Sequence, residues 1–519
     1  MKRSDAVITV FFSLLSVVFL SLTFTVAEAV RCSGARAHCA DLMVLGNWSV
    51  FSEYENRLLE DYSILAVDGS YGTGTFSVSK VNARLKKWLD ANADADAGLK
   101  DRFGLLSDPW RVTAKSSDIP EYALLTDRNG EYFYQQAVDY MRSTSVTGAL
   151  SDLLDLKNLA DTARQDEESY KNSRASDDSL KNMKNTVASR EKEVRSGSTD
   201  DILIYDSSVP QTESAAERQL KKSKKIKNPV WKILSLKRKN VLDLVCGNTK
   251  RSSRKLPGWQ LPSKRSKHTG SLKLKAEYRS AMDDLLFREY LMDHYPNYRD
   301  SQDSSRLNYQ VEYIIGGTAS DEKNLKKTVK SLLLLRETYN YMFLSTDAAS
   351  VGQTQSLSLA ILGWTGSPEL IEAFRQGMMV CWAWGESLYD VRILMHGGKV
   401  PVIKTAADWH VPLSGLASLD KELKKADRTA GSGIGYGDYL RILLNFQTIS
   451  TQKKRALDLL EINIRQADGM SAFRVDNCIV ALRDSSSWEI EPVFSRLPQA
   501  LIGTSAPRLE YTVQSGFSY

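Results

Sequence analysis

The chain has 519 residues, of which 42% are hydrophobic and 25% charged, and its mean hydropathy is −0.33. This composition excludes a disordered or fibrous chain, and the length predicts about three folded units. Its five cysteines are too few for a disulfide-dense scaffold. Cys32 and Cys39 lie too far apart on one predicted helix to pair within it, so we expect buried or idle thiols, with an interchain link as the alternative.

The first predicted element is a transmembrane helix over residues 6–27. These residues carry no charge, and at about 1.5 Å of rise per residue they reach about 33 Å, enough to cross the bilayer core. Lys2 and Arg3 favour a cytoplasmic location for residues 1–5, so we expect a single-pass cell-membrane protein whose bulk is extracytoplasmic. A cleaved secretory signal is the alternative, because Ala27-Glu28-Ala29 fits the cleavage pattern. Both interpretations export the rest of the chain.

Apolar residues continue at steps of three and four and predict a stalk helix over residues 28–66. The stripe consists of Leu42, Leu45, Trp48, Phe51, Leu58, Leu59, Tyr62 and Leu65. Turn residues from Asp68 to Gly72 end this helix. Mixed short helical and extended patterns then predict a membrane-proximal α+β region over residues 67–165.

Residues 166–275 are interpreted as a polar and then basic linker or insert. Residues 166–200 predict a solvated helix or a flexible arm. Residues 218–275, called the basic segment below, contain 19 Lys and Arg and one acid, which gives +18 and leaves −12 for the rest of a chain whose total is +6. We expect a surface excursion that could bind an anionic polymer, lipid headgroups or an acidic partner. Nucleic acid is not expected, because only Trp231 and Trp259 offer stacking surfaces there.

Residues 276–470 predict a helical main domain, and residues 471–519 predict a β-containing region. The alternation in Tyr309–Ile315 predicts a strand that Gly316 and Gly317 close. Helices are predicted at 348–362, 368–396 and 437–467, and a final strand at Leu509–Val513. The predicted class is α+β and helix-rich, with an N-terminal transmembrane helix that continues into the stalk.

No catalytic, cofactor-binding or metal-binding residue is predicted. The histidines lack metal-ligand spacing, Gly431–Gly437 lacks the lysine of a phosphate-binding loop, and no serine lies in a GxSxG elbow. Glu386 and Asp390 share a helix face and are the best candidates for acid–base catalysis. The favoured alternative is a helix packed through its tryptophans with its charges paired. A binding lip or a plain connection is predicted around residues 399–409, with Lys399, Lys404, Asp408 and Trp409.

Several blocks of the sequence resemble known families. Ile8–Leu14, Glu28, Arg31 and Ala35–Asp41 resemble the start of TadE/TadG-type pseudopilin-like proteins of tight-adherence (Flp) pilus systems. Nearly the whole chain resembles an uncharacterised family of clostridial-type Gram-positive bacteria, a domain of unknown function. The matching blocks are Ser49–Tyr54, Pro262–Arg265, Val311–Gly317, Arg336–Asn340, Trp382–Ser387, Asp390–Arg392 and Gly398–Lys404.

The uncleaved apolar helix, the stalk and the absence of catalytic signatures predict a non-enzymatic, membrane-anchored structural protein. The resemblance to TadE/TadG-type proteins implies that it assists the assembly of a pilus or related secretion apparatus. Its partners would be envelope or pilus-type proteins, and no cofactor is implied. Two alternatives remain open. One is a cell-envelope enzyme that acts on wall polymer through Glu386 and Asp390, and the other is an envelope protein that binds an anionic polymer through the basic segment.

Overall fold

The chain folds into two units, and each is formed from segments that are distant in sequence. The sheet unit contains Met1–Ser143, Trp259–Ser280 and Ala456–Tyr519, and the helical unit contains Thr144–Gly258 and Ala281–Arg455. The class is α+β and helix-rich, as predicted. The computed structural model describes residues 2–93, 109–144, 147–196, 215–256, 261–273, 279–301, 306–496 and 507–519.

The sheet unit begins with a long helix, α1 (Lys2–Phe51), which confirms that the helix continues past residue 27. It does not continue to residue 66. The chain leaves the helix after Phe51, and a second helix, α2 (Asn56–Tyr62), begins behind an extended Glu55 whose carboxylate accepts a hydrogen bond from the Arg57 amide. The apolar pattern in the sequence continues past residue 51 because Leu58 and Tyr62 of α2 are also buried within the sheet unit.

A four-stranded antiparallel sheet is arranged around one central strand, β3 (Cys478–Ile490). On one side β3 pairs with β2 (Val112–Leu124). On the other side it pairs with β1 (Val67–Asp68) at its start and with β4 (Leu509–Ser518) along the rest of its length. The predicted final strand is therefore confirmed, and it extends further than predicted.

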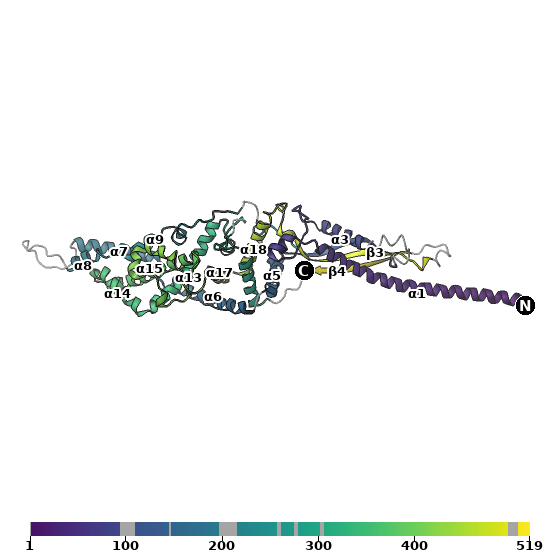
Figure 1. Cartoon of the computed structure of the whole chain (residues 1–519), viewed down its shortest axis with the longest axis horizontal. Coiled ribbons are helices and arrows are strands. Elements are labelled where there is room, and N and C mark those ends of the chain that lie inside the picture. Colours follow the sequence, from purple (N-terminus) through teal and green to yellow (C-terminus); the bar gives the residue numbers. More distant parts are fainter. Residues whose placement is uncertain are drawn as a thin grey trace, which may run out of the picture. The chain divides into compact units, whose positions relative to one another are not determined.

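The second half of α1 forms the core of the sheet unit together with the sheet and α3 (Val78–Ala93). Figure 1 shows α3, β3 and β4 alongside this part of α1. The hydrophobic side chains that α1 contributes to this core are Ala35, Cys39, Leu42, Met43, Val50 and Phe51. They pack with Leu85 and Leu89 of α3 and with Trp488 of β3, so α1 is a structural element of this unit and not a separate stalk.

The helical unit is built around two long helices that pack together, α13 (Asp321–Thr346) and α15 (Pro368–Met395). The predicted helix at 348–362 matches α14, and that at 368–396 matches α15 within one residue. Ser367 begins α15 by accepting a hydrogen bond from the Leu370 amide at 3.3 Å, and Pro368 occupies its first turn.

The remaining helices flank this pair or belong to the sheet unit. They are α5 (Asp127–Thr144), α6 (Thr147–Ser173), α7 (Asp177–Ser196), α8 (Ala215–Ser223), α9 (Pro229–Leu236), α10 (Val241–Val245), α11 (Ala281–His294), α12 (Gln310–Gly316), α14 (Ala348–Leu362), α16 (Leu419–Ala426), α17 (Tyr436–Asn445) and α18 (Ile449–Ile464). Short 3₁₀ turns cover Gly363–Thr365, Ala406–Asp408, Leu413–Ser418 and Val475–Asn477. The residues of α18 up to Arg455 belong to the helical unit and the rest to the sheet unit.

The strand predicted at Tyr309–Ile315 is wrong, because these residues form α12. The alternation suggested one polar and one apolar face, but every residue of α12 is buried. Glu312 is held inside by hydrogen bonds from the Tyr436 hydroxyl at 2.7 Å and the Tyr298 amide at 2.9 Å. The polar residues of this segment are therefore buried together with the apolar ones. Their alternation does not separate an exposed face from a buried face, which is what the prediction of a strand assumed.

The single helix predicted at 437–467 is two helices, α17 and α18. The chain turns at residues 446–448, and the hydroxyl of Thr448 accepts a hydrogen bond from the Thr451 amide at 3.4 Å where α18 begins. A threonine at this position is a helix start signal, which the continuous apolar spacing across the break concealed.

The basic segment is not a surface excursion throughout. It contains α9 and α10, which pack against α15. The apolar side chains of these helices are buried, among them Val230, Ile233 and Leu236. The high density of lysine and arginine concealed two short core helices. Trp259 lies outside the described residues.

Candidate functional site

The two carboxylates singled out in the sequence, Glu386 and Asp390, lie one turn apart on α15 and are fully buried. Both face the ammonium of Lys404, in the connection that follows α15. Lys404 Nζ is 2.5 Å from Asp390 Oδ1, and it also contacts Glu386 Oε1. The structure thus brings together three residues that the sequence had placed in separate features.

Arg336 of α13 completes this group, and we call Glu386, Asp390, Lys404 and Arg336 the buried quartet. Arg336 is fully buried, and its Nε lies 3.1 Å from Asp390 Oδ2. Its Nη1 donates to the backbone carbonyls of Pro401 and Val402 at 2.9 and 2.7 Å. Sequence reasoning did not select Arg336 as a site residue, although a charged residue directly after an apolar run on a core helix was an available signal.

The other hydrogen-bonding positions of the two carboxylates are also occupied. Glu386 Oε2 accepts from the Val411 amide at 2.7 Å, and Glu386 Oε1 accepts from the His410 amide at 3.0 Å. The Asn340 side chain donates to Asp390 Oδ2 at 2.9 Å. Buried ions that are paired and hydrogen-bonded in this way hold elements together, because removing any partner leaves an uncompensated charge.

The charges of the quartet balance, with two cations and two anions. Burial alone would raise the pKa of the Asp390 carboxyl, but Lys404 and Arg336 outweigh it and hold that pKa below its ordinary value. Burial likewise opposes the charge of Arg336, while Tyr439 and Asp390 raise its pKa overall. A catalytic acid needs the opposite arrangement, with a proton that can be exchanged near neutral pH.

Glu386 and Asp390 also lie near His410, a third side chain that can bind a metal ion. Ligand atoms of Glu386, Asp390 and His410 all lie within 4.8 Å of one another, which is close enough to share an ion. However, Lys404 Nζ contacts both carboxylates. A lysine ammonium therefore already neutralises this position, and we assign the quartet a structural role.

The predicted lip around residues 399–409 is a connection held by local contacts, in which Lys399 and Ile403 are exposed. Asp408 accepts from the hydroxyl and the amide of Thr405 and caps a short 3₁₀ turn. The Trp409 ring stacks on Phe343 with centroids 5.2 Å apart. Ile434, in the glycine-rich segment Gly431–Gly437, forms a β-bridge with Val400.

The second candidate site is the first half of α1, which presents apolar side chains to its surroundings. Among the described residues, this is one helix long and apolar enough to cross a membrane, with a mean hydropathy of 2.4 over its most apolar window and none of that window buried. Phe11, Phe19 and Val30 are 61%, 68% and 68% exposed. A stretch of this kind is stable only when a bilayer or partner helices cover it.

Glu28 and Arg31 form a clasp where the apolar half of α1 meets the sheet unit. The Arg31 guanidinium binds Glu28 and donates to the carbonyls of Trp110 at 2.7 Å and Glu491 at 2.5 Å. Glu28 Oε2 accepts from the amide of Phe494 at 2.6 Å and from its two neighbours. One ion pair thus ties α1 to the ends of β2 and β3.

Much of the charge of the basic segment is paired within its own unit. The pairs are Lys224–Glu191, Lys232–Asp420, Lys237–Asp177, Lys239–Asp420, Arg251–Asp243 and Arg265 with Glu461 and Asp476. Each exposed pair contributes little to stability. Together they lower the positive potential that the sequence alone suggested.

Comparison with known proteins gives one match. A model described as a family of unknown function (DUF5702) matches residues 219–490, which is more than half of the chain. The match spans most of the basic segment, the buried quartet and β3. No curated protein and no solved structure matches the chain.

Proposed function

Because the chain belongs to the DUF5702 family, whose function is unknown, we propose a function from its own residues. We propose that it is a single-pass, membrane-anchored protein with an extracytoplasmic bulk, and that it serves as a non-enzymatic, TadG-like component in the assembly of a tight-adherence pilus or related secretion apparatus in the cell envelope. Its partners are then other envelope or pilus-type proteins.

The observation that carries the proposal is the division of α1 into two halves within one helix. Among the residues that the structure describes, none covers the apolar half, and the other half is part of the core of the sheet unit. The clasp of Glu28 and Arg31 lies between them. Because one continuous helix joins the bilayer to the core of the sheet unit, this unit is held at a fixed position next to the membrane. A fixed position of this kind is what an assembly component needs. The resemblance of Ile8–Leu14, Glu28 and Arg31 to TadE/TadG-type proteins supports the pilus assignment.

The alternative of a wall-polymer enzyme has less support. Glu386 and Asp390 are fully buried and are neutralised by Lys404 and Arg336. A polymer could reach neither carboxylate without breaking the quartet. The alternative of anionic-polymer binding is weakened by the ion pairs of the basic segment. In the part of this segment that the structure describes, Lys225 and Lys227 form no ion pair and bear on partner binding.

Labelling of single introduced cysteines in intact protoplasts tests the topology. Ser345→Cys, at an exposed position of α13, should react with a membrane-impermeant maleimide, whereas Ser4→Cys should react only after permeabilisation. The unmodified chain gives the background from its native thiols, of which all but Cys32 are buried. The reverse labelling pattern would place the bulk in the cytoplasm and end the proposal.

A second experiment tests the assembly role. Deletion of the gene in its host should abolish surface fibres or the export that depends on them, and the full chain should restore them. A chain with Phe12→Arg and Phe19→Arg, which cannot span the bilayer, should fold but fail to restore them. Normal fibres in the deletion strain would refute the pilus assignment while leaving the topology unaffected.

A further inference from the structure

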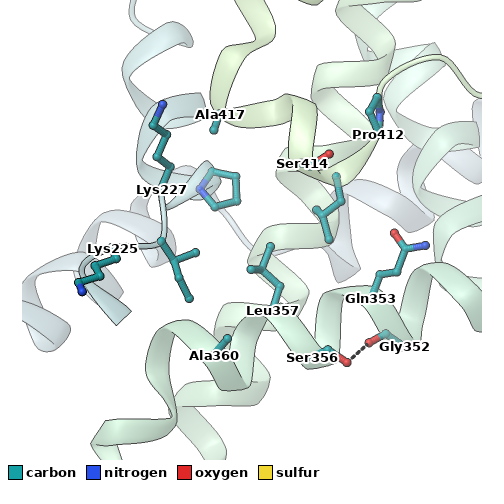
Figure 2. Close-up of a pocket in the computed structure, with 13 residues that line it drawn as sticks. Lys225, Lys227, Gly352, Gln353, Ser356, Leu357, Ala360, Pro412, Ser414 and Ala417 are labelled. Carbon is teal, nitrogen blue, oxygen red and sulfur yellow. Dashed lines mark hydrogen bonds between the residues drawn. The ribbon is translucent and has the colours of Figure 1, made fainter. Parts of the chain in front are cut away.

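An open groove of about 980 Å³ lies on the surface of the helical unit. Figure 2 shows its walls, which are one face of α14, the connection between α8 and α9, and the 3₁₀ turn that begins at Leu413. Apolar side chains line its middle, including Ile226, Leu357 and Leu413. A volume of this size is typical of a specific binding site.

The floor of the groove is made of small residues on successive turns of α14. Gly352, Ser356 and Ala360 lie four residues apart, and the Ser356 hydroxyl is turned back onto the Gly352 carbonyl at 2.9 Å (Figure 2). A Cβ added at Gly352 would meet no atom within 4 Å. Glycine inside a helix costs about 1 kcal/mol relative to alanine, and the described residues give no packing reason for it here. Close approach of a bound partner would supply one.

Two lysines give this groove a positive charge. Lys225 and Lys227 extend from the α8–α9 connection, on the left in Figure 2, and none of the described residues that line the groove is acidic. In the part of the chain that the structure describes, neither ammonium forms an ion pair, whereas the adjacent Lys224 is paired with Glu191. These two cations are therefore available to a ligand.

Polar side chains also occur at the opposite side of the groove. Figure 2 shows Gln353 and Ser414 across from the two lysines. An anionic amphiphile would use the lysines and the apolar middle, and these exposed amide and hydroxyl groups would remain bound to water. A polypeptide satisfies all three parts, because its backbone supplies donors and acceptors along its whole length.

We propose that this groove binds a segment of a partner protein in which a run of large apolar side chains is flanked by carboxylates. The apolar side chains lie over Gly352 and Leu357, and the carboxylates pair with Lys225 and Lys227. The inference gives the assembly role proposed above a docking site, and it rests on that role for the nature of the partner. Binding is measured on the purified protein, so its failure is distinguishable from a failure of the membrane topology.

The test uses the full chain in detergent and a fluorescent peptide, STDDILIYDSS, which has the proposed composition and the sequence of residues 198–208. Asp200→Asn, Asp201→Asn and Asp206→Asn are introduced into the chain, so that its own copy of this sequence lacks the carboxylates and does not compete with the peptide. Fluorescence anisotropy should show saturable binding. Two matched peptides separate the contributions: STNNILIYNSS lacks the carboxylates and STDDSSSYDSS lacks the aliphatic run. Each should bind at least about tenfold more weakly, which corresponds to 1.4 kcal/mol.

Variants of the chain locate the binding. Gly352→Leu should fill the groove and weaken binding at least about tenfold, and it should fold because the space above Gly352 is open. Gly363→Leu is the matched control, since a Cβ there also meets nothing within 4 Å but the residue does not line the groove. Lys225→Glu with Lys227→Glu should abolish binding, while Lys222→Glu on α8 should change it less than about twofold.

Three results would overturn the proposal. Absence of saturable binding to the chain with the three Asp→Asn changes is the first, and equal binding to the carboxylate and amide peptides is the second. The third is equal loss in Gly352→Leu and Gly363→Leu, with thermal melting showing that both variants are folded. Binding of dihexanoyl phosphatidylglycerol in place of the peptide, lost in Gly352→Leu, would assign the groove to an anionic lipid instead.

Discussion

Lys404 lies between two buried carboxylates, so its removal tests the structural role of the quartet. Lys404→Met should lower the free energy of unfolding of the helical unit by about 3–5 kcal/mol, because a buried anion loses its partner. Lys399→Met, at an exposed position of the same connection, should change it by less than about 0.5 kcal/mol. Urea unfolding followed by tryptophan fluorescence measures both.

The double variant Lys404→Met with Glu386→Gln provides the decisive comparison. It removes one charge of each sign, so Arg336 and Asp390 remain a neutral pair. Part of the stability lost in Lys404→Met should therefore return. If Lys404→Met leaves stability unchanged and alters a wall-polymer cleavage activity instead, the quartet is catalytic and its structural assignment is wrong.

Glu312 gives the stability of the helical unit a dependence on pH. Its carboxyl is fully buried, one of its oxygens has no hydrogen-bond partner among the described residues, and burial raises its pKa to about 7. Between about pH 4.5 and 7 the unfolded chain releases this proton while the folded chain keeps it. The free energy of unfolding should therefore fall as the pH rises through this window, by up to about 3 kcal/mol.

Glu312→Gln should remove this slope, because an amide does not titrate, while the hydrogen bonds from Tyr436 and Tyr298 are kept. Urea unfolding at several pH values compares the two chains. Equal slopes in the variant and the parent would show that other groups cause the pH dependence.

At the scale of elements, the structure changes what is expected of the basic segment. Ile233 of α9 is fully buried, so Ile233→Ala should destabilise the helical unit by about 2–4 kcal/mol. Arg238→Ala, at an exposed position just after α9, should cost less than about 0.5 kcal/mol. Deletion of residues 218–255 should unfold this unit. A deletion variant with unchanged melting would restore the interpretation of this segment as a surface excursion.

The success of sequence-based prediction depended on the local signals at each element. The start of α15 was predictable because Ser367 and Pro368 are strong start signals, and Gly397 and Gly398 lie just beyond its end. The prediction failed at α12, where Gln310 and Glu312 are polar but buried, and at the α17–α18 break, where apolar spacing runs on. The side chains that pair with Glu386 and Asp390 come from α13 and from a loop, and no local pattern indicates such contacts.

At the scale of the whole molecule, the clasp tests how the apolar half of α1 is joined to the sheet unit. Arg31→Ala removes a buried guanidinium and leaves Glu28 without its ion-pair partner, so the sheet unit should lose about 2–3 kcal/mol. Arg36→Ala, at an exposed position one turn later on α1, is the control and should cost less than about 1 kcal/mol. Hydrogen exchange at the amides of Val493 and Phe494 gives a local readout. Unchanged protection in Arg31→Ala would show that the clasp does not fix α1.

The division into two units was beyond the reach of sequence patterns, which led us to expect contiguous regions. The pairing of Tyr122 with Leu482 joins residues 360 positions apart, and no composition change marks it. In β3, Cys478–Leu482 are all buried, so both faces of the strand are covered and the alternation is lost there. Long-range strand pairing of this kind leaves no periodic signal in either partner.

The central position of β3 has a consequence for biosynthesis. Translation makes α1 first, and β3 and β4 follow more than 400 residues later. At a synthesis rate of about 5–20 residues per second, the buried face of α1 waits tens of seconds for the strands that cover it. During that time Leu42 and Met43 are exposed and can form non-native contacts. The helical unit, which ends at Arg455, is completely synthesised before β3. The nascent chain should therefore require a chaperone, and crosslinks from Met43 to such a factor should disappear once synthesis passes β4.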